Sequence, residues 1–114
     1  MKIVKKSNQN EIADNVKVAN NPITRFVGLL NRSSLNKGEG LWIVPCNSIH
    51  SFGMKFKFDA VFIDKNNQVK HLVKNMDKWK ASAIIFSAHS VLELPAGTID
   101  SENIEIDDIL EFIK

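Results

Sequence analysis

The sequence predicts a mainly β fold (α+β by content), a single-domain β-sandwich or jelly-roll-like barrel with one amphipathic helix and one short helical turn. Short stretches of alternating apolar and polar residues recur along the chain, turn-forming residues separate them, and only one segment has clear helical spacing. The 114 residues suffice for one domain over residues 1–114, and 44% hydrophobic and 25% charged residues are ordinary globular values.

The first third of the chain is expected to hold two short strands followed by the helix. Ile12, Val16 and Val18 share one parity between Asn-rich turns, as strand residues do. The amphipathic helix is expected at about residues 22–30, because Asn21 can cap it and Pro22 suits its first turn. Its apolar stripe would follow the spacing i, i+3, i+4 and i+7 through Ile23, Phe26, Val27 and Leu30.

The rest of the chain is expected to be β-rich. Strands are predicted at residues 41–44, 56–63, 69–73, 91–94 and 109–113. Asp64–Gln68 is predicted to be a hairpin turn, because Asn tolerates a positive φ. A short helical turn is predicted near residues 99–103.

Several short segments occur in an order that is informative beyond each motif alone: Arg25–Leu30, Glu39–Leu41, Cys46–Lys55, Asp59–Asp64, Trp79–Lys80 and Val91–Gly97. This succession resembles the "domain of unknown function 192" family over about residues 18–112. The resemblance implies a small β-sandwich of jelly-roll type with short helices, and it brings no assigned activity. Lys57 stands where the family usually has proline.

Charge and composition limit the classes of binding partner that the protein could have. Residues 81–114 carry seven acids and one lysine, for a net charge of −6, so residues 1–80 carry +8. The lysines are scattered and only two arginines are present, which argues against a nucleic-acid partner. No apolar run could span a membrane and no signal peptide is recognisable, so we expect a cytoplasmic location, although members of the resembled family are often exported. No cofactor is indicated, and the oligomeric state is left open.

Most of the residues suited to chemistry lie between Cys46 and Lys57. Cys46, His50 and Met54 are spaced by four and offer a thiolate, an imidazole and a thioether, the soft donors that hold copper. The alternative, which we favour, makes Cys46 a small buried apolar residue and Met54 a core filler. We therefore expect no metal site.

A catalytic hypothesis uses His50 as base, with Cys46 as nucleophile or Asp59 as partner, in a small hydrolase or lyase. Asp59 lies between apolar residues, where we favour structural anchoring by loop N–H groups or by a nearby cation. Glu93 raises the same question, and simple alternation predicts that it lies on a solvated face.

The leading functional hypothesis is a non-catalytic module that binds a small polar or anionic ligand near Cys46–Met54. Aromatic platforms beside polar groups are typical of such sites, and Phe52, Trp42 and Trp79 are the aromatics expected to be partly exposed. The expected ligand-binding residues are His50, Phe52, Met54, Lys55, Asp59, Arg25 and Trp79. The remaining alternative is a protein-interaction or assembly domain without a small-molecule site.

Overall fold

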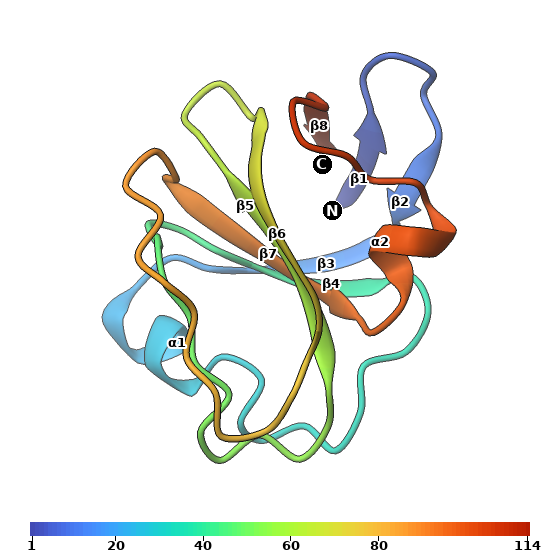
Figure 1. Cartoon of the computed structure of the whole chain (residues 1–114). Helices are drawn as coiled ribbons and strands as arrows, with labels where there is room; N and C mark the ends of the chain where they lie inside the picture. The colour runs from blue at the N-terminus through green and yellow to red at the C-terminus, as the bar shows by residue number, and fades with distance from the viewer.

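The computed structural model describes residues 1–114 and contains eight strands and two short helices, which confirms the mainly β prediction (Figure 1). The strands are β1 (Lys2–Lys5), β2 (Glu11–Ala13), β3 (Asn15–Ala19), β4 (Glu39–Ile43), β5 (Phe58–Ile63), β6 (Val69–Met76), β7 (Ser90–Pro95) and β8 (Leu110–Ile113). The helices are α1 (Pro22–Val27) and α2 (Thr98–Ser101). Neither helix has the length and apolar character that a membrane-spanning helix requires.

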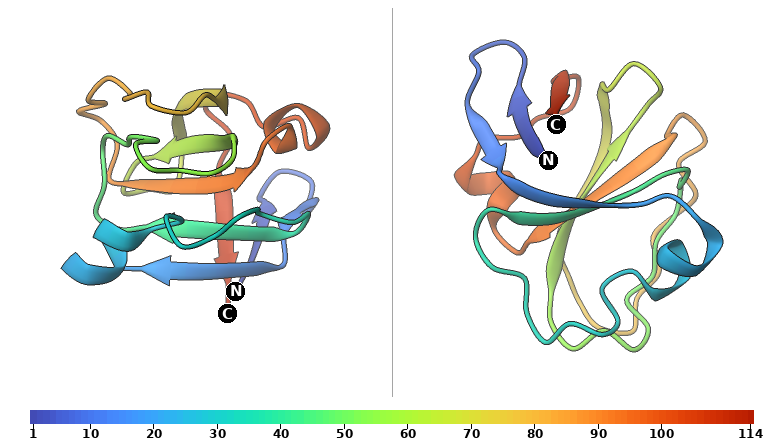
Figure 2. Two further views of the ribbon diagram at one scale, coloured as in Figure 1. Left: turned by 90° about the horizontal axis from the view of Figure 1, so that it is seen from below. Right: turned by 180° about the vertical axis from the view of Figure 1, so that it is seen from behind.

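The strands form two open sheets. The larger has the order β3-β4-β7-β5-β6 and the smaller has the order β2-β1-β8. Strands β3 and β4 run parallel, and the other pairs are antiparallel. Figure 2 shows α1 and α2 at opposite ends of the larger sheet. Because the sheets stay open and contain a parallel pair, the jelly-roll and barrel details of the prediction are not confirmed.

The larger sheet is buried on both faces. One face packs against the smaller sheet through a cluster of 12 buried residues that includes Ile3, Val61 and Leu92. The other face carries a second cluster of 11 residues that includes Phe58 and Val91. The central strands β5 and β7 therefore contribute buried side chains to both sides, as near-continuous apolar runs do in two-sided sheets.

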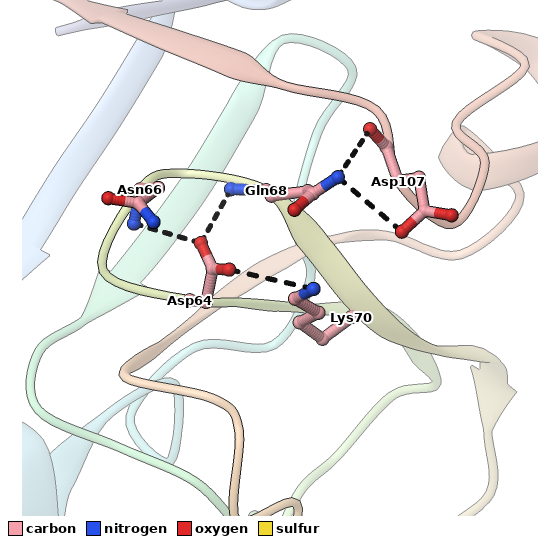
Figure 3. A network of polar contacts seen from close by, with 5 residues as sticks. All are labelled: Asp64, Asn66, Gln68, Lys70 and Asp107. Atoms are coloured by element: carbon pink, nitrogen blue, oxygen red, sulfur yellow. Dashed lines mark hydrogen bonds and ion pairs between the residues drawn. The ribbon is translucent and has the colours of Figure 1, made fainter.

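The β5–β6 hairpin confirms the predicted turn. The Asp64 Oδ1 atom accepts hydrogen bonds from the backbone N–H groups of Asn66 (2.8 Å) and Gln68 (2.9 Å), and Asn67 adopts a φ of 63° (Figure 3). Lys70 lies 3.7 Å from the other carboxylate oxygen. The Gln68 amide donates to the Asp107 carbonyl at 3.3 Å, which ties the hairpin to the segment before β8.

Two expectations for the N-terminal third were wrong. Three strands occur before the helix where two were expected, because Lys2–Lys5 pairs with both β2 and β8. The helix spans only Pro22–Val27, and its apolar stripe is not buried: Ile23 is 75% exposed and Phe26 is 79% exposed. The helix ends because Gly28 takes a positive φ of 49°, after which Leu29 turns into the core.

Two long loops run beside α1 and are hydrogen-bonded to each other. The β4–β5 loop and the β6–β7 loop are joined by backbone bonds from Ser82 to Ile49 and from Ile85 to Asn47, each 2.8 Å long. The buried Ser51 hydroxyl accepts a hydrogen bond from the Lys80 N–H at 2.9 Å and fixes the same pair of loops further along. Figures 1 and 2 both show these loops beside α1.

Candidate functional site

A cavity of about 380 Å³ lies between α1, the β4–β5 loop and the larger sheet. Its apolar wall includes Leu29, Ile43 and Ile49. Its polar or polarisable side chains come from three elements: Arg25 from α1, Cys46, Ser48, His50 and Met54 from the loop, and Glu93 from β7. The cavity therefore combines apolar walls with a few convergent polar groups, the usual composition of a small-molecule site.

The floor of the cavity is built by the middle of the larger sheet. Glu93 stands in register with Ala60 of β5 and Leu41 of β4, so these three side chains share one face. The neighbouring Leu92 and Leu94 point to the opposite face, into the cluster shared with the smaller sheet.

Glu93 is the exceptional residue of this floor. It is 5% exposed, and burial alone raises the pKa of its carboxyl from about 4.5 to about 8. No protein group pairs with the carboxyl, whose oxygens stay accessible from the cavity and are not sealed in the core. The expectation of a solvated face was wrong because β7 is a central strand with both faces covered. At neutral pH the carboxyl is mainly protonated and can both donate and accept a hydrogen bond.

Cys46 is half-buried beside this carboxyl. Its Sγ atom donates a hydrogen bond to the Ser48 carbonyl at 3.1 Å. Burial is the largest influence on the thiol and raises its pKa. The backbone of Ser48 and the positive charge of Arg25 lower that pKa, and Glu93 raises it further once its carboxyl is ionised. A thiol held in this way is protonated at neutral pH and is a poor nucleophile.

Arg25 supplies positive charge to the same cavity. The α1 helix that carries it is capped by Asn21, whose side chain accepts a hydrogen bond from the Thr24 N–H at 2.9 Å. The guanidinium is exposed and takes part in none of the five ion pairs of the protein. It is therefore available to an anionic group.

An aromatic row extends from the rim of the cavity. The rings of His50 and Phe52 stack with centroids 5.2 Å apart, and those of Phe52 and Trp79 follow at 6.0 Å. Phe52 is 47% exposed and Trp79 is 69% exposed, as expected for a platform. Trp42 instead packs on Phe112 with centroids 4.1 Å apart and is not part of this row.

The remaining predicted residues divide between the cavity and other places. Met54 is buried and lines the cavity together with Cys46 and His50, so the three soft donors do share one site. No group of three or more His, Cys, Asp or Glu side chains is placed to hold a metal ion. Lys55 is exposed and does not line the cavity.

Asp59 lies on the opposite face of the sheet, in register with Leu94. Its carboxylate accepts three backbone hydrogen bonds, from Asn75 (2.7 Å), Gly97 (3.1 Å) and Ile99 (2.8 Å). These contacts fix the start of α2 against β5 and β6. The structure gives Asp59 the anchoring role that we favoured over a catalytic one, and it does not bring Asp59 to His50.

The comparisons with known proteins identify the family. The model of DUF192, described as Uncharacterized ACR, matches residues 3–112, and the chain belongs to this family. A UPF0127 protein of Thermococcus sibiricus is 31% identical over 102 residues, which cover 85% of this chain and 65% of that relative. The chain thus spans less than two thirds of that relative's length.

Two further relatives agree with this assignment. The UPF0127 protein PF1050 of Pyrococcus furiosus is 28% identical over 107 residues, which cover 90% of each chain. A crystal structure of a protein of unknown function from Novosphingobium aromaticivorans superimposes with a TM-score of 0.84 over 97% of this chain and 82% of that one. At 17% identity, this likeness shows the fold alone.

Sequence reasoning named four of the six polar or polarisable residues of this cavity, missed Ser48 and gave Glu93 the wrong environment. The signal that could have corrected it is the run Val91-Leu92-Glu93-Leu94, whose apolar residues occupy both parities. Such a run is typical of a strand covered on both faces, where any acid must be buried.

Proposed function

We propose that the protein is a non-catalytic module that binds a small polar or anionic ligand in the cavity beside α1. The observation that carries the proposal is the buried carboxyl of Glu93, which has no partner within the protein. An unpaired buried acid costs stability, and such costs are concentrated at functional sites. A ligand that reaches Glu93 would supply the missing partner.

The other polar groups of the cavity are suited to the same task. The Arg25 guanidinium offers a fixed positive charge for an anionic group of the ligand. Phe52 and Trp79 offer flat apolar surface next to the opening, in line with His50. Met54 and Ile49 supply apolar contact inside. Lys55 and Asp59, which do not line the cavity, are left out of the proposed site.

Catalysis by the residues first considered has less support. The oxygens of Asp59 are occupied by three backbone donors on the other face of the sheet. Burial raises the pKa of the Cys46 thiol, which disfavours the thiolate. An enzymatic function would have to use Glu93 as a general acid, with His50 at the rim as the second group.

A second candidate function is protein docking, and the exposed apolar face of α1 favours it. Ile23 and Phe26 stand largely in solvent, and Phe86 of the β6–β7 loop is 87% exposed. Exposed apolar residues of this size are typical of interaction surfaces when they form one patch. Docking would depend on these residues, whereas ligand binding would depend on Glu93 and Arg25.

Native mass spectrometry of gently purified protein tests the leading proposal. We expect wild type to retain or take up small acids, amino acids or sugars, and both Glu93→Gln and Arg25→Ala to lose that binding. Lys55→Ala is the matched control, because it removes an exposed positive charge that lies outside the cavity. If no compound of the panel binds and none shifts an NMR resonance of the cavity residues, the proposal is wrong.

A further inference from the structure

Arg25 and Glu93, two groups that ionise with opposite sign, line the cavity without forming an ion pair with each other. Arg25 approaches from α1, and Glu93 rises from β7 on the floor. No ion pair joins them, and Arg25 is not among the influences on the Glu93 carboxyl. Both nevertheless act on the pKa of the Cys46 thiol, in opposite directions, and all three residues line the same cavity. A site whose two ionisable groups of opposite sign form no ion pair with each other suits a ligand that also carries both signs.

We propose that the ligand is a small zwitterion whose anionic group binds Arg25 and whose ammonium group binds Glu93. This inference rests on the proposed binding function and specifies its ligand class. The two ends would neutralise both protein groups, so that no net charge is added to a partly apolar cavity. A purely anionic ligand would contact Arg25 but would leave Glu93 without a partner.

The surroundings of Glu93 favour an ammonium group at its end of the cavity. The polar groups that line the cavity with it are Cys46, Ser48 and His50 of the β4–β5 loop and Arg25 of α1. Apolar Leu41 and Ala60 are its partners in register on the sheet. None of these forms an ion pair with the carboxyl. An ammonium group would donate hydrogen bonds to the carboxylate and stabilise its charged form.

Binding of an ammonium group to Glu93 should release a measurable number of protons. With a pKa of about 8, about nine-tenths of the Glu93 carboxyls are protonated at pH 7. An ammonium ligand binds the ionised form, so the carboxyl proton passes to the buffer when the complex forms. Binding near pH 7 should release about 0.9 proton per ligand. A ligand that leaves the carboxyl protonated releases none.

The test uses linear ω-amino acids from aminopropanoate to aminohexanoate, with hexanoate and hexylamine as one-ended controls. Isothermal titration calorimetry in two buffers of different ionisation enthalpy gives both the affinity and the number of protons released. We expect at least one amino acid to bind about tenfold or more tightly than either control, with proton release. Glu93→Gln should abolish the release and weaken binding about tenfold, whereas Lys55→Ala should change neither.

Three results would overturn the inference. If hexanoate binds as tightly as the best amino acid, Arg25 alone recognises the ligand, so the zwitterion is wrong and the proposed binding function stands. Binding without proton release, together with unchanged affinity in Glu93→Gln, would show that no ammonium group binds an ionised Glu93. If none of these probes binds but sugars or acids bind in the native mass spectrometry panel, the zwitterion is wrong and the binding function survives; if nothing binds in either experiment, both fail.

Discussion

Replacing Glu93 by glutamine should change how the stability of the protein depends on pH. Glutamine keeps the size and the polar end of the side chain but cannot ionise. In the wild type, burial raises the pKa of the carboxyl from about 4.5 to about 8, so the folded state holds this proton more tightly than the unfolded state. The folded state therefore loses stability as pH rises through the interval between these two values.

The size of the effect follows from the two pKa values. A difference between 4.5 and about 8 corresponds to about 5 kcal/mol at 1.36 kcal/mol per pKa unit. Between about pH 5 and about pH 8.5, the linkage relation gives a loss of about 4 kcal/mol that Glu93→Gln should not suffer. This figure is an upper limit, because water that enters the cavity would stabilise the ionised carboxylate.

Urea unfolding of both proteins across this pH range measures the difference directly. All other titrating groups are shared, so the difference between the two curves isolates Glu93. The wild type should be the less stable protein at the alkaline end, and the two should converge towards pH 5. Parallel curves across the range would refute the reasoning, because they would mean that Glu93 ionises in the folded protein as easily as in the unfolded chain.

Three further predictions concern other parts of the structure. Asp59→Ala should lower the free energy of unfolding by about 3 kcal/mol in urea denaturation, because three backbone donors lose their acceptor, and a loss under 1 kcal/mol would contradict the anchoring role. Phe26→Ser should change stability by less than about 0.5 kcal/mol, whereas Leu29→Ala should cost about 2–4 kcal/mol; similar losses would mean that α1 packs in solution. Arg25→Ala should move the pH midpoint of Cys46 alkylation by iodoacetamide upward, because the guanidinium lowers the pKa of the thiol, and an unchanged midpoint would separate the two groups.

Local sequence chemistry predicted the turns and most strands well. Asp64–Gln68 forms the expected turn because the Asp side chain can accept hydrogen bonds from its own backbone and Asn67 tolerates a positive φ. Asn21 caps α1 as expected, for a similarly local reason. Such features can be predicted from the sequence because they depend only on residues that are close together along the chain.

Features set by distant contacts were harder to predict. The apolar residues of 22–30 have helical spacing, yet α1 ends at Gly28. Ile23 is exposed to solvent because the apolar face of this short helix does not pack against the sheet. Glu93 is buried because β7 lies between β4 and β5. The alternation of apolar and polar residues within one strand does not reveal which strands will lie beside it. The same limit applies to Asp59. The sequence indicated that its carboxylate would need hydrogen-bond donors, but it did not reveal that Asp59 lies on the face of the sheet opposite the cavity.

The central claim is that Glu93 remains unpaired and mainly neutral in the cavity until a ligand arrives. The most direct test follows the ¹³C shift of the Glu93 carboxyl by NMR as pH is raised, with Glu93→Gln used to assign the resonance. The account predicts a midpoint near pH 8, as burial without a partner requires. A midpoint close to the ordinary value of 4.5 would contradict it, because the carboxyl would then be hydrated or paired at neutral pH.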